Sequence, residues 1–343
     1  MTVSNTSILS EEILILIMSH VGPLSQLQEC RLVCKAWCNP GLINMLGQEI
    51  TLRSELGIFR LYDILVKDPS KGFLVKHLVF DTEDSCSFVL KELLYLILTP
   101  NMETIKGEIN NEDFYNEFNK VMQRWPNKFE KLHQMTSCDE VTVPYFQALM
   151  HFKDTLQAMV FNIGEYSEGV AYECAKNLSQ FIRLTSLKME GWYQRLWNME
   201  EVLKYCPYIE ELSLNIHEES GNVLEPPAMK DWAESAVEQQ YNLKTLSIQT
   251  NCPADYMQYL VYKYPNIDSI RIDIELDDDF IEINMDRIIH LIRDIPNKQI
   301  TFTVGTGLSF REIIQDLQAY SYHVVIDKVH VNGDIRLVLA TMA

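Results

Sequence analysis

Apolar residues recur along most of the chain in a six-residue motif whose first, fourth and sixth positions are apolar. The clear copies are Val75–Phe80, Leu156–Phe161, Leu184–Met189, Ile209–Leu214, Leu243–Ile248 and Ile267–Ile272, and weaker copies surround Ile105, Leu132, Ile300 and Val329. The central residues of successive copies are 24 (Leu246 to Ile270) to 34 (Leu212 to Leu246) residues apart. Such self-similarity predicts stacked structural units, each in contact with its neighbours only.

Each copy of the motif predicts a short strand, and a stretch with helical spacing usually follows it. The apolar residues of these stretches fall at i, i+3, i+4 and i+7, as in the segment that contains Phe114 and Phe118. The predicted helices are 88–98, 113–125, 145–152, 169–181, 195–205, 256–264, 285–295 and 310–320. The stretch Glu218–Lys230, with Pro226 and Pro227, predicts a surface loop inserted in the longest repeat.

The first part of the chain has a different, all-helical pattern. Residues 1–7 are expected to form a short disordered lead. The predicted helices begin after Ser10, after Gly22-Pro23 and near Val33, and Pro40-Gly41 ends the third. Three short helices carry more apolar side chains than they can bury themselves, so this unit is expected to pack on the repeats or on a partner.

The sequence from Ile8 to Trp37 resembles the F-box. The resemblance rests on Ile8-Leu9-Ser10-Glu11-Glu12-Ile13-Leu14 and on Cys30-Arg31-Leu32-Val33-Cys34-Lys35-Ala36-Trp37, with Ser10 where the family usually has proline. It implies docking onto the Skp-type adaptor of an SCF ubiquitin ligase and, through the adaptor, onto a cullin. By position, the residues that would form or brace the adaptor-binding surface are Leu9, Ile13, Leu14, Ile17, Leu27, Val33, Cys34 and Trp37. Alternatively, these residues are ordinary core packed against the first repeats.

The repeated motif resembles the leucine-rich repeat, and the order of parts resembles fungal-type F-box proteins that carry such repeats. Their Cys-Pro-x-Leu-x-x-Leu pattern is matched best by Cys206-Pro207-Tyr208-Ile209-Glu210-Glu211-Leu212. The resemblance implies an α/β fold with a three-helix F-box at residues 8–48. A curved solenoid of about ten degenerate repeats follows at 49–343, with a parallel sheet inside and helices outside.

Polar side chains dominate the outward positions of the predicted strands. Because side chains alternate along a strand, these residues would share one exposed face of the sheet. We predict that a target protein binds there through Lys188, Glu190, Trp192, Tyr193, Glu211, Asn215, Gln249 and Arg271. The aromatic group of Trp192, Tyr193 and Trp197 fits an interface or a core equally well. The mildly apolar stretch near Val79, Ala158 and Val160 is either a partner patch or tolerated variation.

Charge and composition narrow the choice of partners. The 343 residues include 29 basic and 48 acidic ones, a net charge of −19. This charge argues against nucleic acid or an anionic membrane as the main partner, and it indicates either solubility alone or a basic partner. No signal peptide and no apolar run of about 18 residues is visible. The eight cysteines are scattered, as expected for reduced thiols in the cytoplasm and/or nucleus.

Candidate patterns for catalysis or metal binding are weak. Cys30, Cys34 and Cys38 share one helical face but lack the histidine of a usual zinc site. The alternating acidic residues of 273–279 lack the glycine and the glutamate of a calcium-binding loop. No G-x-S-x-G, P-loop or H-E-x-x-H motif occurs. We therefore expect no enzyme activity, no metal and no cofactor.

An adaptor-type motif joined to a binding-type repeat array predicts a function. The chain is expected to be the substrate-recognition subunit of an SCF-type E3 ubiquitin ligase, acting in ubiquitin-dependent protein degradation. The alternative is a scaffold or inhibitor that uses the repeats for protein binding without ubiquitination. The sequence does not separate these two possibilities.

Overall fold

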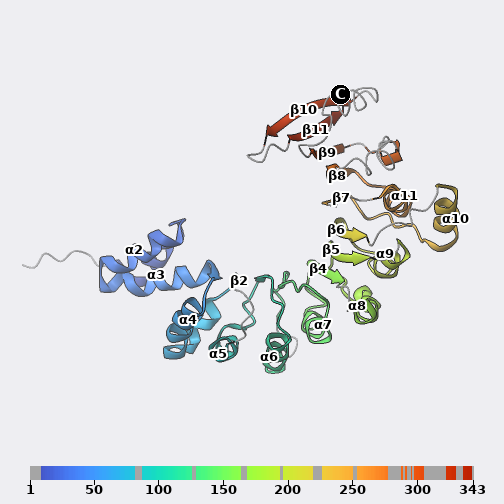
Figure 1. Cartoon of the computed structure of the whole chain (residues 1–343). Coiled ribbons are helices and arrows are strands. Elements are labelled where there is room, and N and C mark those ends of the chain that lie inside the picture. The colour runs from blue at the N-terminus through green and yellow to red at the C-terminus, as the bar shows by residue number, and fades with distance from the viewer. Residues whose placement is uncertain are drawn as a thin grey trace, which may run out of the picture. The chain divides into compact units, whose positions relative to one another are not determined.

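The structure, a computed structural model, describes residues 9–81, 87–125, 129–163, 168–193, 196–218, 226–249, 253–276, 287–288, 290–291, 295, 297–304, 322–329 and 335–341. It has two compact units: unit 1 comprises Met1–Ser137 and Pro144–Leu156, and unit 2 comprises Cys138–Val143 and Gln157–Ala343. N-terminal helices precede alternating helices and mainly parallel strands (Figure 1), so the predicted α/β class is confirmed. The predicted lead 1–7 and most or all of the predicted helices 285–295 and 310–320 lie outside the described residues.

Unit 1 begins with three helices and continues with alternating strands and helices. The N-terminal helices are α1 (Glu11–Ser19), α2 (Leu24–Val33) and α3 (Lys35–Gly47). A parallel sheet follows, made of β1 (Glu49–Leu52), β2 (His77–Phe80) and β3 (Thr104–Gly107). The remaining elements are α4 (Glu55–Lys67), the 3-10 helix η1 (Pro69–Leu74), α5 (Phe88–Ile97), α6 (Glu112–Met122) and α7 (Val143–Met150).

Unit 2 contains one eight-stranded sheet with helices that follow its strands. The parallel strands are β4 (Ala158–Ile163), β5 (Ser186–Tyr193), β6 (Glu211–Glu218), β7 (Thr245–Ile248), β8 (Ser269–Leu276) and β9 (Asn297–Val304). The helices are α8 (Glu168–Ala175), the 3-10 helix η2 (Leu178–Gln180), α9 (Leu196–Leu203), α10 (Pro226–Ala236) and α11 (Ala254–Lys263). Two antiparallel strands, β10 (Tyr322–Val329) and β11 (Ile335–Thr341), complete the sheet.

The apolar positions of the motif face the core in both units. In β4, buried residues alternate with half-buried ones over all six positions. The strands are paired in phase, so equivalent apolar residues stand side by side. One such row in unit 2 consists of Met159, Leu187, Leu212, Leu246 and Ile270, all of them buried.

A backbone carbonyl just before five of the described strands joins neighbouring repeats. The carbonyl oxygen of Gln157 accepts hydrogen bonds from the N–H groups of Thr185 and Ser186, at 3.0 Å each. The carbonyl oxygens of Thr185, Glu210 and Lys244 each accept two such bonds from the next repeat, and Lys76 does the same in unit 1. The acceptor is always the residue after the first apolar position of the motif, so this bond sets the register of adjacent strands.

An asparagine just before the motif adds a second link in two repeats. Asn101 Nδ2 donates to the carbonyl oxygen of Phe73 at 2.9 Å, and Asn242 Nδ2 donates to that of Pro207 at 2.9 Å. Each asparagine directly precedes the first apolar residue of its motif, and each acceptor lies two residues before that position in the preceding repeat. The two bonds are therefore equivalent, although they lie in different units.

Helix α3 continues through Pro40, where the sequence predicts its end. The additional turns bury Leu42 and Leu46, and this burial offsets the hydrogen bond that proline cannot donate. Gly41 allows α2 to come close, because a Cβ atom at this position would lie only 2.5 Å from Cγ of Arg31. The predicted helix end at Pro40-Gly41 is therefore wrong.

The stretch predicted as a loop contains the start of helix α10. Pro226 and Pro227 open this helix, which proline permits because the first N–H groups of a helix have no partner within it. Trp232 of α10 packs against Tyr259 of α11 with ring centroids 5.6 Å apart. The loop prediction is wrong for residues 226–230, and residues 219–225 lie outside the described ones.

A buried ion pair joins α9 to α11, although α10 lies between them in the sequence. Lys263 Nζ is 2.8 Å from Glu200 Oε2, and the Tyr259 hydroxyl donates to the same oxygen at 2.5 Å. Burial lowers the pKa of Lys263 and raises the pKa of Tyr259 well above its usual value. These polar groups can be buried because they bind one another.

The parallel order of the sheet ends at β9. Strand β11 pairs antiparallel with both β9 and β10, and β10 forms the edge of the sheet. The motif copy centred on Val329 lies at the end of β10 and therefore adds no parallel strand.

We expect Gly107→Ala to lower the free energy of unfolding by about 1–3 kcal/mol. The φ angle of Gly107 is +102°, and a Cβ atom would collide with the carbonyl oxygen of Phe80. The control is Gly57→Ala in α4, where a Cβ atom meets only Ser54 Oγ at 3.6 Å, and its effect should stay below about 1 kcal/mol. Urea denaturation measures both, and equal effects would contradict the steric explanation.

We expect Lys263→Met to lower the free energy of unfolding by about 3–5 kcal/mol, because Glu200 would remain buried without its cation. The double variant Glu200→Leu, Lys263→Met should lose less than the sum of the two single variants. The control is Lys176→Met, since Lys176 forms an exposed pair with Glu173 at 2.5 Å, and it should cost less than about 1 kcal/mol. Additive effects in urea denaturation would show that the buried pair is not coupled.

Candidate protein-docking surface

The three N-terminal helices are held together around α3. Their buried side chains are Leu14 and Met18 of α1, Leu27 of α2, and Leu42 and Leu46 of α3. Polar contacts support this packing: Asn44 Nδ2 of α3 donates to the carbonyl oxygen of Ile15 at 3.0 Å, and Arg31 of α2 approaches Met45 Sδ at 3.8 Å. The helices therefore have one shared interior, and α3 occupies its centre.

Six large apolar side chains of these helices remain exposed, and we call them the F-box apolar set. They are Leu9, Ile13, Leu16 and Ile17 at α1, and Leu32 and Val33 at the end of α2. Leu32 is 86% exposed and Val33 is 65% exposed. Ile13, Leu16 and Ile17 are spaced i, i+3 and i+4, so they share one side of α1, and Leu9 lies just before its N-cap. Exposed apolar groups of this kind mark interaction surfaces.

The eight residues predicted to form or brace the adaptor-binding surface divide into two groups. Leu9, Ile13, Ile17, Val33 and Cys34 are exposed, and Trp37 is half-buried. Leu14 and Leu27 are 3% and 0% exposed, so they can only brace the surface from inside. Leu16 and Leu32 belong to the exposed set, yet the sequence prediction leaves them out. Leu16 follows Ile13 by one helical turn, and this spacing was the signal that could have identified it.

Ser10 occupies the N-cap position of α1, as predicted, but its side chain accepts no hydrogen bond from the helix backbone. Hydrogen bonds from the Glu12 backbone N–H and from the Ser10 hydroxyl instead hold the pKa of Glu12 below its usual value. Glu12 therefore stays ionised in the first turn of α1, where the helix dipole favours negative charge.

The second candidate surface is the polar face of strands β5 to β8 in unit 2. Lys188 and Glu190 lie on β5, two residues apart, and form an ion pair at 2.5 Å. Their partners on β6 are Ser213 and Asn215, respectively. The polar residues thus form rows across the strands, as the alternation of side chains requires.

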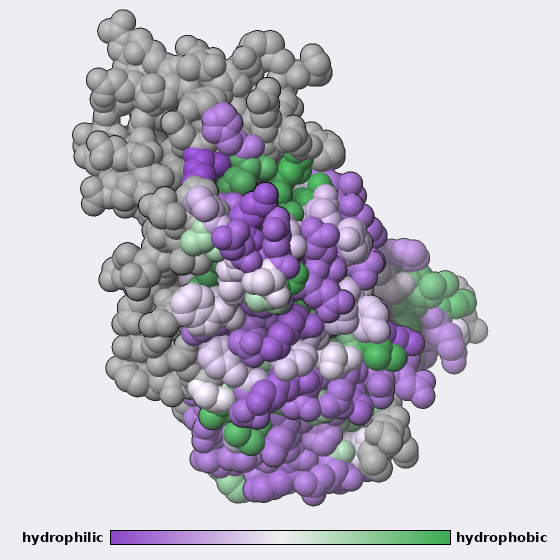
Figure 2. Space-filling view, turned by 90° about the vertical axis from the view of Figure 1, so that its right-hand side faces the viewer, coloured by the Kyte–Doolittle hydropathy of each residue, from purple (hydrophilic) through white to green (hydrophobic). Residues whose placement is uncertain are grey.

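The other predicted target-binding residues lie on the same strands or next to them. Glu211, Gln249 and Arg271 are exposed, and Arg271 stands in the row of Lys188 and Ser213. Trp192 and Tyr193 belong to β5, but their side chains are outside the described ones. Figure 2 views the molecule from the side on which α10 and α11 lie in Figure 1, and it shows mainly hydrophilic residues with hydrophobic ones in small groups.

Neither a metal centre nor a membrane span is found in the part of the chain that the structure describes. Among those residues, no group of three or more His, Cys, Asp or Glu side chains is arranged to hold a metal ion. No helix formed by them is both long and apolar enough to cross a membrane. The acidic residues 277–279 lie outside the described ones, and the side chains of Asp273 and Glu275 are not described either.

The comparison with protein families identifies the N-terminal helices. Residues 7–39 match the family model of the F-box domain. The matched residues include α1, α2 and the first part of α3. The chain therefore carries an F-box domain, and the F-box part of the resemblance is confirmed.

Comparisons with curated proteins and with solved structures give no further family for this chain. No curated protein matches the chain. Among solved structures, the chain is similar to one described as "Crystal structure of Rad7 and Elc1 complex in yeast", at 13% sequence identity and a TM-score of 0.38. That match covers 88% of this chain and 91% of the other chain. A similarity of this strength supports no statement about function.

Proposed function

We propose that this chain is the substrate-recognition subunit of an SCF-type E3 ubiquitin ligase. The observation that carries the proposal is the coincidence of the F-box match with the F-box apolar set: residues 7–39 include all six exposed side chains. The F-box would bind a Skp-type adaptor and, through it, a cullin. The leucine-rich-repeat solenoid that we infer for the rest of the chain would bind the target protein.

The exposed residues can supply binding free energy because docking would remove their apolar surface from water. Burying one Leu, Ile or Val side chain contributes about 1.5–3 kcal/mol relative to leaving it in water. Leu32 and Val33 are mostly exposed in the free chain, so most of their contribution is available to a partner. Leu14 and Leu27 support the surface but gain nothing further from docking, since both are already buried.

The repeats would bind a target through the polar rows of β5 to β8. The adaptor and cullin then hold that target near a ubiquitin-charged partner, which raises the effective concentration of its lysines. Catalysis belongs to that partner, so we propose no enzyme activity for this chain. We place the complex in the cytoplasm and/or nucleus, where its thiols stay reduced.

We expect the variant Ile13→Asp, Val33→Asp to lose co-purification with a Skp-type adaptor while staying folded. Both side chains are exposed, so the carboxylates remain hydrated in the free chain and are desolvated only on docking. Leu14→Asp is unsuitable, because Leu14 is buried and its replacement would unfold the helices. The measurement is co-purification of the full chain with the adaptor, with circular dichroism to verify folding.

The matched control is Phe88→Asp, which places the same charge on an exposed apolar residue of α5 outside the F-box match. This variant should bind the adaptor like the unmodified chain. Equal binding by all three proteins would exclude the F-box apolar set as the docking surface. Adaptor binding without any effect on the lifetime of a bound target would favour the scaffold or inhibitor role.

A further inference from the structure

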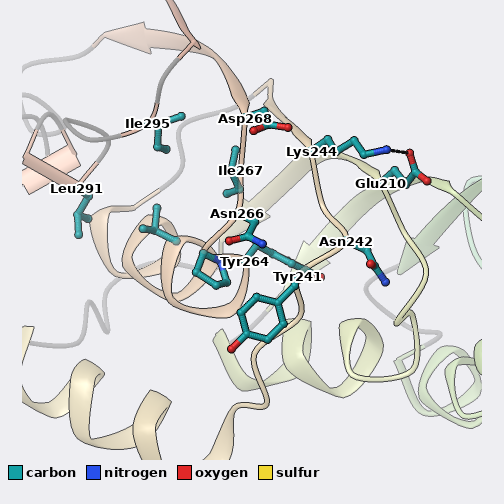
Figure 3. A pocket seen from close by; sticks show the side chains of 12 residues that line it. Glu210, Tyr241, Asn242, Lys244, Tyr264, Asn266, Ile267, Asp268, Leu291 and Ile295 are labelled. Carbon is teal, nitrogen blue, oxygen red and sulfur yellow. Dashed lines mark hydrogen bonds and ion pairs between the residues drawn. The ribbon is translucent and has the colours of Figure 1, made fainter.

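Unit 2 contains a pocket of about 660 Å³ at the turn between α11 and β8 (Figure 3). Its apolar side is formed by Val261, Ile267, Leu291 and Ile295. Tyr241 and Asn266 belong to the turns that precede β7 and β8, and both line the pocket. All these residues belong to unit 2, whereas the F-box lies in unit 1.

The hydrogen bond from an asparagine to the preceding repeat is not formed at this pocket. Asn266 directly precedes the first apolar residue of its motif, as Asn101 and Asn242 do in theirs. By analogy with those two, Asn266 would donate to the carbonyl oxygen of Tyr241. In the described part of the chain that bond is absent, and neither the Asn266 carboxamide nor the Tyr241 carbonyl oxygen has another partner. Two residues that line the pocket, Asn266 and Tyr241, therefore carry a donor and an acceptor that no group in the described part of the chain satisfies.

Of the two carboxylates at the mouth of the pocket, one is paired with a lysine and the other can bind a basic group of a ligand. Glu210 and Lys244 form an ion pair at 2.5 Å, and the hydrogen bond that Lys244 donates to Glu210 raises the pKa of Lys244. Lys244 is thus neutralised by its neighbour. Asp268 is exposed and, among the described residues, forms no ion pair or side-chain hydrogen bond, although its charge also raises the pKa of Lys244. The mouth accordingly has a net negative charge.

We propose that this pocket binds an extended peptide segment of a partner protein, with an apolar side chain next to a basic one. A peptide can accept a hydrogen bond from the Asn266 carboxamide through a carbonyl oxygen and donate one to the Tyr241 carbonyl oxygen through an N–H group. It can therefore satisfy both groups. The apolar side chain enters between Ile267, Leu291 and Ile295. The basic side chain reaches Asp268.

Other ligand classes fit the same residues less well. A phosphate or carboxylate would need a free cation, and the one lysine of the lining is held by Glu210. A purely apolar ligand would leave the open donor and acceptor without partners, which costs affinity. The inference does not depend on adaptor binding, so the two can fail separately.

The test is a selection of random octapeptides displayed on phage against the immobilised full chain, followed by fluorescence titration of the enriched peptides. We expect the enriched peptides to share an apolar residue beside Lys or Arg. Asn266→Ala should weaken their binding by about tenfold, and Asp268→Lys should do the same. Exchange of the basic residue of the peptide for Glu should restore binding to Asp268→Lys.

The matched control is Asn101→Ala, which removes an equivalent asparagine whose bond is formed. This variant should lower the melting temperature and leave peptide affinity unchanged. Asn266→Ala should leave the melting temperature unchanged and weaken peptide binding, because no bond within the described part of the chain is lost. A fall in melting temperature as large as that of Asn101→Ala would place Asn266 in a closed link and overturn the inference.

Two further results would also contradict it. Enriched peptides without the apolar–basic pair, or equal binding to all variants, would show that the pocket does not select this chemistry. Concentration-dependent dimerisation that Asp268→Lys abolishes, measured by sedimentation, would identify a second copy of the chain as the occupant instead.

Discussion

The repeats depend on one backbone constraint: the carbonyl oxygen that accepts two N–H groups from the next repeat. Gln157, Thr185, Glu210 and Lys244 provide this oxygen at the same position of the motif. A shift of one residue would turn every strand side chain to the opposite face. The bond therefore determines which residues enter the core, and it places the polar rows on the other side of the sheet. Side chains reinforce it only locally, as in the Glu210–Lys244 pair.

The sequence predicts the motif strands well because burial is required at regular positions. Leu187 and Met189 are buried as the pattern indicates, and their register follows from the pairing with β6. The pattern fails where packing overrides local signals. Pro40 lies inside α3 because the turns after it bury leucines, and Pro226 opens a helix that packs on α11. The antiparallel pairing of β10 and β11 depends on contacts distant in sequence, which no local pattern contains.

The candidate site could be predicted only as a region. The F-box pattern identifies which residues are apolar, but not which of them α3 buries. Leu14 and Ile13 are neighbours in the sequence, and only the position of α1 against α3 makes one buried and the other exposed. The open link at Asn266 is even less predictable. Its sequence position equals that of Asn101, yet only Asn101 forms the bond to the preceding repeat.

The exposed apolar residues of the F-box follow from the small size of its core. Three short helices share one interior, and α3 takes up most of the apolar contact that α1 and α2 can make inside it. The remaining side of α1 and the end of α2 can be buried only by another molecule. A partner that covers them adds the second layer of core that the helices lack. The net charge of −19 offsets this exposure, because like-charged chains repel one another before their apolar residues can meet.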